Sequence, residues 1–318
     1  MTAPVEVSRR RAWLMAARPQ TLPAGASPVI LGTGLAVHEG VAAPLPALAA
    51  LLGALLIQIG TNFANDYFDA VKGTDEPDRE GFTRVTAGGL IEPGTVRRAM
   101  VGTYALAVVV GLYLVFVGGV PILVVGLSSI VAGVLYTGGP YPYGYYGLGD
   151  LFVFLYFGVV AVTGTYYVQA AASLPAVGPF PTGLPAGTLP PVAVVTSLAA
   201  AGLATAILVV NNVRDREDDA AAGKRTLAVI VGDFWSRVEF LAMVVLAYVV
   251  PVVLWGWFGL EASVLLPLVS LPLAVPVTRT VLTGSAGEAL NRALERTGQL
   301  FAIHSVLFAV GLAAPVVL

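Results

Sequence analysis

The strongest constraint on this chain is a series of long apolar runs that fill most of its length. Hydrophobic residues make up 57% of the sequence and charged residues only 11%, a balance typical of a polytopic membrane protein. The runs are too long and too uniformly apolar for barrel strands, so they predict helices. We therefore expect an all-α polytopic membrane protein with about nine transmembrane helices, forming a single integral-membrane domain over residues 1–318. The predicted spans are residues 20–37, 44–68, 97–117, 120–137, 149–170, 190–212, 237–257, 263–282 and 298–317.

The basic residues are confined to four segments, and this predicts an orientation. With nine spans, all four segments lie on one side of the membrane, which the positive-inside rule makes the cytoplasmic side. We expect a multi-pass protein of the cell membrane with its N-terminus inside and its C-terminus outside. There is no basic stripe for nucleic acid, and no obligate protein partner is evident. The 17 basic residues are Arg9, Arg10, Arg11, Arg18, Lys72, Arg79, Arg84, Arg97, Arg98, Arg214, Arg216, Lys224, Arg225, Arg237, Arg279, Arg292 and Arg296.

Two charged motifs follow even-numbered spans, at residues 62–89 and 211–226. Asn65 and Asp69 are four residues apart, as are Asn211 and Asp215, so each pair shares a helix face. Each motif also contains one of the only two lysines in the chain, Lys72 or Lys224. This weak internal repeat predicts two similar half-sites that face each other at the cytoplasmic ends of their helices.

Clustered carboxylates near a membrane are unfavourable unless a cation compensates them. The chain has no cysteine and only two histidines, His38 and His304, both outside the motifs. Oxygen ligands alone select hard cations such as Mg²⁺ or Mn²⁺, and the interleaved basic residues suit phosphate oxygens. The candidate metal ligands are Asn65, Asp66, Asp69, Asp75, Asn211, Asp215 and Asp219. The candidate diphosphate donors are Lys72, Arg79, Arg84, Lys224 and Arg225.

Two blander interpretations compete with a metal–diphosphate site. One is a solvated loop rich in charge, which the matched pair of motifs disfavours. The other is a cation channel or carrier, which is weaker because the acids cluster at span ends rather than at mid-membrane.

A turn-rich aromatic segment covers residues 137–148 on the side of the motifs. Its tyrosines fit either a membrane-interface belt or a pocket for an aromatic or prenyl group, and Tyr141, Tyr143 and Tyr145 are the pocket candidates. Arg18 either reaches the site or marks the interface. Gln169 is expected to pack rather than to touch substrate, and residues 171–190 are expected to form an outer connecting loop.

The motifs resemble those of the UbiA superfamily of intramembrane aromatic prenyltransferases. Its first motif, Asn-Asp-x-x-Asp-x-x-x-Asp, is matched by Asn65, Asp66 and Asp69, whereas Gly73 takes the last position, with Asp75 two residues later. That departure is typical of the MenA branch, whose version of the motif runs as it does here over residues 64–81. The second motif, Asp-x-x-x-Asp, is matched by Asp215 and Asp219. Further matches are residues 18–23, 142–150, 166–170 and 294–297.

The resemblance implies nine transmembrane helices around a central cavity with both motifs at its cytoplasmic mouth. For the MenA branch it implies Mg²⁺-dependent transfer of a polyprenyl group from polyprenyl diphosphate to 1,4-dihydroxy-2-naphthoate, with loss of CO₂ and diphosphate. The implied product is demethylmenaquinol, a precursor of menaquinone. Hydroxybenzoate, homogentisate, a chlorin or a phosphosugar remain alternative acceptors. The residues implied in catalysis are Asp66, Asp69, Asp215, Asp219 and Lys224.

Overall fold

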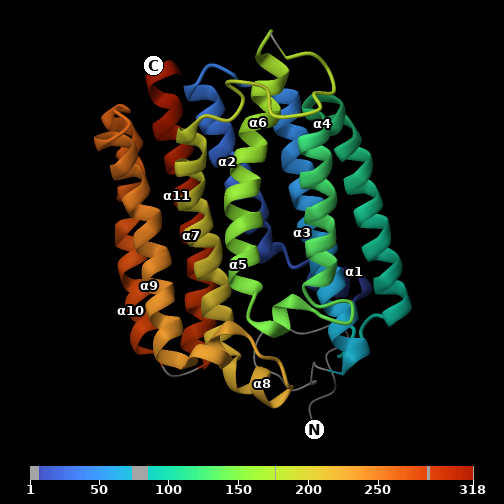
Figure 1. The fold of residues 1–318 in the computed structure, drawn as a ribbon. Helices are drawn as coiled ribbons and strands as arrows, with labels where there is room; N and C mark the ends of the chain where they lie inside the picture. The colour runs from blue at the N-terminus through green and yellow to red at the C-terminus, as the bar shows by residue number, and fades with distance from the viewer. Residues whose placement is uncertain (1–6, 74–84, 176, 285–286, 318) are drawn as a thin grey trace.

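In this computed structural model, helices are the only regular secondary structure of the described residues, which are 7–73, 85–175, 177–284 and 287–317 (Figure 1). No strand occurs among them. Shorter helical turns cover Pro19–Thr21, Tyr143–Tyr146, Phe154–Val160 and Ala262–Ser270. The helices are α1 (Arg9–Ala17), α2 (Leu22–His38), α3 (Pro44–Lys72), α4 (Pro93–Leu135), α5 (Gly149–Val153), α6 (Ala161–Ser173), α7 (Pro191–Arg214), α8 (Arg216–Ala221), α9 (Leu227–Gly256), α10 (Leu271–Thr283) and α11 (Gly287–Val317).

Seven helical segments of the described chain are long and apolar enough to cross a membrane. Two of them combine elements, because α5 continues into α6 and the turn before α10 continues into α10. The expected all-α membrane fold is therefore confirmed. The exact number of nine spans stays a prediction, since α2 has only 17 residues and α4 counts once despite an interruption.

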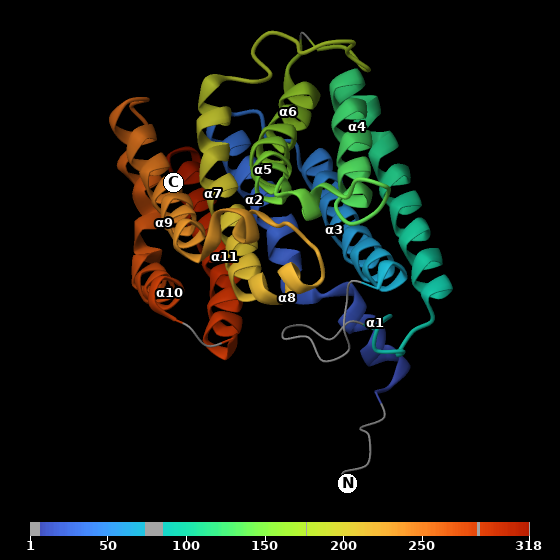
Figure 2. The ribbon, with the colours of Figure 1, turned by 60° about the horizontal axis from the view of Figure 1, so that its bottom comes forward.

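That interruption lies at Gly119, where α4 turns back on itself. Gly119 has φ 63° and ψ −148°, a conformation that side chains disfavour. The two limbs of α4 lie side by side in Figures 1 and 2. A Cβ atom at Gly133 would be 2.7 Å from the Tyr104 hydroxyl, so positions about equally far from Gly119 meet across the limbs. The interruption falls at the predicted boundary between spans 97–117 and 120–137.

Small residues let the helices on the other side of the bundle approach closely. A Cβ atom added at Gly158 would lie 2.2 Å from Ala201 Cα, and one added at Gly202 would lie 2.4 Å from the Met243 carbonyl oxygen. Close backbone approach of this kind is how helices pack in lipid, where burial of apolar surface gives little driving force. As a result α7 is buried among its neighbours and forms the centre of one packed half.

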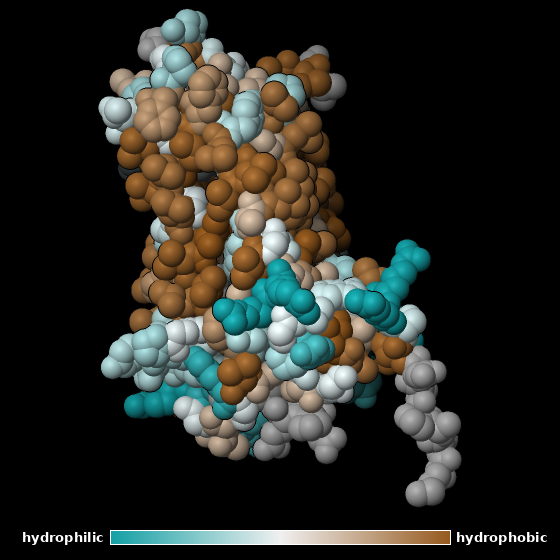
Figure 3. All heavy atoms as spheres, turned by 90° about the vertical axis from the view of Figure 1, so that its right-hand side faces the viewer, coloured by the Kyte–Doolittle hydropathy of each residue, from teal (hydrophilic) through white to brown (hydrophobic). Residues whose placement is uncertain are grey.

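The two ends of the bundle differ in polarity. Helices α1 and α8 lie at one end, whereas the end of α11 and the connection after α6 lie at the other (Figures 1 and 2). In Figure 3 a broad hydrophobic band covers the side of the molecule, and strongly hydrophilic side chains gather toward the end that carries α1. The arrangement positions both charged motifs at one end of an apolar bundle. The orientation of that end toward the cytoplasm stays a prediction.

Candidate active site

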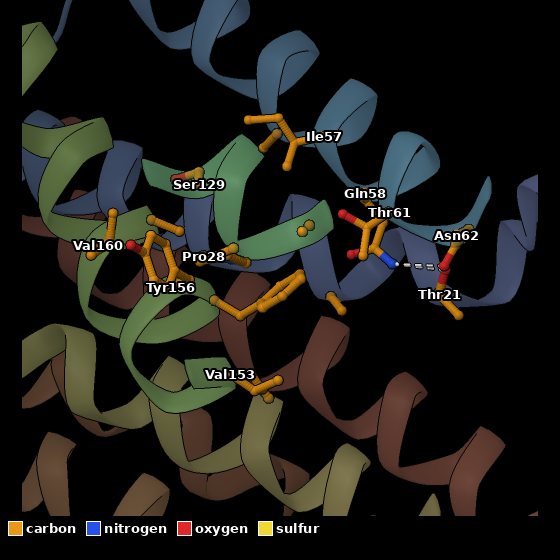
Figure 4. Close-up of a pocket in the computed structure, with 18 of the residues that line it drawn as sticks. Thr21, Pro28, Ile57, Gln58, Thr61, Asn62, Ser129, Val153, Tyr156 and Val160 are labelled. Atoms are coloured by element: carbon orange, nitrogen blue, oxygen red, sulfur yellow. Dashed lines mark hydrogen bonds between the residues drawn. The ribbon is translucent and has the colours of Figure 1, made fainter. Parts of the chain in front are cut away.

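A cavity of about 960 Å³ opens between the two packed halves of the bundle. Its walls come from α2, α3, α4, α6, α7 and α11, with the turn before α6. Apolar side chains such as Pro28, Ile57 and Val160 surround most of it, as Figure 4 shows, with Gln58 and Asn62 at one side. The polar end is lined by Arg18, Asn65, Asn211, Arg214, Asp215, Asn291 and Arg292, among others. The cavity thus joins a charged mouth to an apolar chamber large enough for a small organic ligand.

The described acids of the first motif, Asp66 and Asp69, lie in the last two turns of α3, and both are buried. The carboxylate of Asp66 is 1% exposed and accepts hydrogen bonds from the backbone N–H (3.1 Å) and the hydroxyl of Thr86. The carboxylate of Asp69 is 2% exposed and accepts a hydrogen bond from the Tyr145 hydroxyl. Asn65 lines the cavity, and its Oδ1 accepts a hydrogen bond of 3.0 Å from Thr137.

The second motif lies where α7 ends and α8 begins, and an arginine binds its central acid. Arg214 donates two hydrogen bonds to Asp215, from Nε to Oδ1 (2.6 Å) and from Nη2 to Oδ2 (2.8 Å). It also donates to Asn211 Oδ1 and to Asn291 Oδ1, each at 2.9 Å. Both partners of this bidentate pair are almost fully buried, and a buried pair is maintained only when its geometry is good.

The two motifs meet through Lys224 and Tyr145. Lys224 Nζ lies 3.8 Å from Asp69 Oδ2, so the lysine of the second motif pairs with an acid of the first. Both lysines lie over the Tyr145 ring, whose centroid is 5.3 Å from Lys72 Nζ and 5.0 Å from Lys224 Nζ. Lys72 Nζ also donates to the carbonyl oxygens of Thr137 (2.6 Å) and Gly139 (3.1 Å). The aromatic segment therefore connects the two halves of the site.

The other predicted residues of the second motif lie around this contact. Asp219 in α8 is 4% exposed, and its carbonyl oxygen accepts the backbone N–H of Lys224 at 2.8 Å. Arg225 is exposed, but its backbone N–H donates to the Tyr145 carbonyl oxygen at 2.9 Å. Asp75, Arg79 and Arg84 lie outside the described residues, so the structure assigns them no position.

The predicted tyrosines divide into three environments. Tyr143 lines the cavity, donates to the Ala132 carbonyl oxygen at 2.8 Å and stacks on Phe152 with 4.1 Å between ring centroids. Burial raises the pKa of Tyr143 above its ordinary value, so the hydroxyl stays protonated. Tyr145 contacts the motifs as described. Tyr141 is 78% exposed and lies outside the cavity lining, so the structure does not support its assignment to the pocket.

Two further residues had roles that the sequence left uncertain. Arg18 lines the cavity from the junction between α1 and α2, with a left-handed backbone at φ 50°. Gln169 is fully buried in α6, where its Oε1 accepts the Ala43 N–H at 3.3 Å and its Nε2 donates to the Thr165 carbonyl oxygen at 3.0 Å. These contacts fit the packing role expected of Gln169.

The donor set suits a hard cation, although the acids do not converge. The described candidate ligands offer carboxylate and amide oxygens, the ligands that Mg²⁺ prefers. Among the described residues, however, no three acidic or histidine side chains lie close enough to hold a metal ion. Instead Asp69 faces Lys224 and Asp215 faces Arg214. Two of the buried carboxylates are therefore compensated by protein cations in this arrangement.

Sequence reasoning missed several residues of the site. Thr86 and Thr137 bind Asp66 and Asn65, and Tyr136 lines the cavity beside Tyr143. In the sequence analysis Arg214 served only as a cytoplasmic charge. Its position three residues after Asn211 and next to Asp215 is a local signal that could have indicated a role in the site. The contact from Asn291 on α11 has no such signal, because it joins residues 77 positions apart.

Comparison with known sequences identifies relatives along nearly the whole chain. The model of the UbiA prenyltransferase family matches residues 26–313. The chain is 38% identical to the 1,4-dihydroxy-2-naphthoate octaprenyltransferase of Escherichia coli, covering 96% of each chain. It is 36% identical to the protein of that name from Mycobacterium tuberculosis, over 95% of this chain and 96% of the relative. The human UbiA prenyltransferase domain-containing protein 1 is 29% identical, over 94% of this chain and 82% of that protein.

Solved structures share the fold at much lower sequence identity. A UbiA homologue from Aeropyrum pernix is 12% identical and aligns with a TM-score of 0.68, covering 92% of this chain and 97% of its own. A UbiA homologue from Archaeoglobus fulgidus, bound to DMAPP and Mg²⁺, is 15% identical and aligns with a TM-score of 0.58, covering 94% of this chain and 99% of its own. These likenesses support the helical architecture.

Proposed function

Because the chain belongs to the UbiA prenyltransferase family, we propose that it transfers a polyprenyl group from a polyprenyl diphosphate to 1,4-dihydroxy-2-naphthoate. Diphosphate and CO₂ leave, and the product is demethylmenaquinol. The acceptor is inferred from the Escherichia coli and Mycobacterium tuberculosis relatives, whose names specify this naphthoate. The donor is inferred from the archaeal homologues with bound DMAPP or GPP and Mg²⁺.

The observation that carries the proposal is the cavity with a charged mouth and an apolar chamber. A polyprenyl diphosphate has the same division, with an anionic head and a long hydrocarbon tail. Lys72 and Lys224 come from separate motifs and meet at the Tyr145 ring, although neither lysine lines the cavity itself. The chamber is lined by apolar residues of α2, α3, α4 and α6, where the tail and the naphthoate ring would lie.

In this proposal the acids hold a divalent cation and the bases hold the diphosphate. Asp66, Asp69, Asp215 and Asp219, with Asn65 and Asn211, would bind Mg²⁺ or Mn²⁺, and Asp75 would take the place of the acid missing at Gly73. When bound, the cation supplies neutralisation of the charge on the leaving diphosphate. Lys72, Lys224 and Arg225, with Arg79 and Arg84, would donate to the diphosphate oxygens.

The described contacts indicate what these side chains do before the donor binds. Lys224 lies beside Asp69, and Arg214 pairs with Asp215, so protein cations offset the charge of both carboxylates. The Tyr145 hydroxyl fixes the Asp69 carboxylate, and Thr86 fixes that of Asp66. Such preorganised groups need little rearrangement when charge develops on the leaving group.

In the proposed reaction no residue has to remove a proton from the ring carbon, because the carboxylate leaves in its place. The allylic C–O bond of the donor breaks, and both of its electrons leave with diphosphate. The electron-rich naphthoate carbon that carries the carboxylate forms the new C–C bond. The C–CO₂⁻ bond then breaks, and its electrons restore the aromatic ring. Tyr143 and Phe152, which stack at the cavity wall, offer aromatic faces near this chemistry.

The test is transfer to naphthoate labelled at its carboxyl carbon. Purified protein with Mg²⁺ and a polyprenyl diphosphate is expected to release labelled CO₂ and form a prenylated quinol in equal amounts. Asp69→Asn and Asp215→Asn are expected to abolish both while keeping membrane expression. Transfer to hydroxybenzoate with no CO₂ release from naphthoate would reject the proposed acceptor. Metal flux into liposomes without diphosphate, together with no transfer, would favour a cation carrier.

A further inference from the structure

A second concavity lies between α9 and α10, apart from the central cavity. Its volume is about 570 Å³, and none of its lining residues lines the central cavity. Buried Val244 and Ala274 form its floor, and half-exposed Val245, Val249 and Val275 form its rims. We call it the α9–α10 groove, lined by Leu241, Val244, Val245, Tyr248, Val249, Val252, Leu271, Ala274, Val275, Thr278, Arg279, Leu282 and Thr283.

Arg279 is the one charged residue in the described lining of this groove. It lies one turn before the end of α10 at Thr283, and its side chain is exposed. The neighbouring Arg237 is already paired, because its Nε lies 2.7 Å from Asp233 Oδ2 and its guanidinium donates to the Val281 carbonyl oxygen. For Arg279, by contrast, no ion pair occurs within the described part of the chain. The groove therefore has an apolar body and, at one end, a cation that pairs with no acid of the described chain.

The position of Arg279 along the bundle matches the level of lipid headgroups. It lies near the end of α10 that leads into α11, which is the end of the bundle where α9 begins. From Arg279 the groove lining runs along α10 to Leu271, a distance of about 12 Å of helix. The hydrocarbon of one leaflet is about 15 Å deep. A single acyl chain can therefore lie along the groove while its headgroup reaches Arg279.

We propose that the α9–α10 groove binds an anionic phospholipid, with one acyl chain against the valines and the phosphate on Arg279. Charge selects this occupant, since a guanidinium binds phosphate through paired hydrogen bonds and gains most from a lipid with net negative charge. Exposed apolar side chains by themselves fit any lipid. Arg279, which pairs with no described acid, gives the site its preference. The proposal does not depend on the prenyl transfer proposed above.

Native mass spectrometry of the delipidated, full-length protein in detergent tests this site. The probes are phosphatidylglycerol and phosphatidylcholine with identical acyl chains, titrated separately. We expect one phosphatidylglycerol to bind more tightly than any phosphatidylcholine. Arg279→Gln should weaken that binding roughly fivefold, the effect of about one surface cation on an anionic lipid. Val249→Trp should weaken binding of the acyl chain by filling the groove.

Two matched variants control for general effects. Arg97→Gln removes an exposed arginine on α4, and Val109→Trp enlarges an exposed valine on α4, both away from the groove. Both should bind phosphatidylglycerol as the unchanged protein does. Equal binding of the two lipids, or equal losses in Arg279→Gln and Arg97→Gln, would overturn the proposal. The proposal would also be overturned if the site that Val249→Trp blocks retained a polyprenyl diphosphate in place of phospholipid. Gel filtration of each variant checks that it is folded.

Discussion

At the residue scale, Arg214 is a buried, bidentate partner of Asp215. Removing the guanidinium in Arg214→Met breaks this buried pair and should lower the free energy of unfolding by roughly 3 kcal/mol. The melting temperature in detergent measures this loss, and Arg214→Met/Asp215→Asn should recover part of it. Arg216→Met is the control, because its ion pair with Glu217 is exposed and contributes less than about 1 kcal/mol. An unchanged melting temperature in Arg214→Met would contradict this account.

Tyr145 offers a second test at the same scale, because its hydroxyl and its ring have separable contacts. Tyr145→Phe removes the hydrogen bond to Asp69 but keeps the ring contacts with Lys72 and Lys224. A hydrogen bond to a charged group contributes enough that prenyl transfer should fall roughly tenfold. The Mg²⁺ concentration that gives half the maximal rate should rise as well. Tyr146→Phe, at a 53% exposed position, should leave both values unchanged.

The residue scale also shows where sequence reasoning stops. Spacing and the scarcity of lysine were enough to single out Asp69, Asp215, Lys72 and Lys224. The contacts between the motifs could not be predicted, since the Tyr145–Asp69 hydrogen bond joins residues 76 positions apart. Sequence position alone cannot assign a cavity role to one of several neighbouring tyrosines, which is why Tyr141 was grouped with Tyr143.

At the scale of elements, the reversal of α4 depends on the lack of a side chain at Gly119. A Cβ there would lie 1.8 Å from the Pro181 carbonyl oxygen, in addition to the strain of its positive φ. Gly119→Ala should therefore lower the free energy of unfolding by at least about 2 kcal/mol. Gly126→Ala is the control, because its Cβ would meet nothing within 4 Å in a helix interior. Thermal unfolding of both variants measures this difference. Equal stability of Gly119→Ala and Gly126→Ala would show that the reversal tolerates a side chain.

Helix ends show a second limit of prediction, this time for whole elements. The apolar runs predicted starts at residues 237 and 298, whereas α9 begins at Leu227, with a break at Gly232, and α11 begins at Gly287. The added turns carry ion pairs four residues apart, Arg237 with Asp233 and Arg292 with Glu288. Such pairs stabilise a helix in water. Hydropathy therefore marks the part of a helix that lipid covers, and the helix itself continues beyond it.

At the scale of the whole molecule, we expect the charged end of the bundle and the opposite end to lie on different sides of the membrane. Helix α1 lies at one end and the last turn of α11 at the other (Figure 1). The positive-inside rule assigns the end with the motifs to the cytoplasm. A fluorescent protein fused before α1 should therefore fluoresce, and alkaline phosphatase fused after α11 should be active. Activity from a phosphatase placed before α1 would reverse the orientation and move the motifs outside.

The apex of α4, the reversal at Gly119, has a consequence for biosynthesis. The Val120 N–H donates to the Pro181 carbonyl oxygen at 2.9 Å, and the Phe180 N–H donates to the Phe116 carbonyl oxygen at 3.0 Å. Both bonds need a segment that the ribosome adds about 60 residues later, and synthesis at ~5–20 residues per second makes that a wait of several seconds. During this interval the apex needs water or the insertion machinery to satisfy its peptide groups. A pause in translation between the two segments would therefore prolong the stage at which the nascent chain is most exposed to quality control.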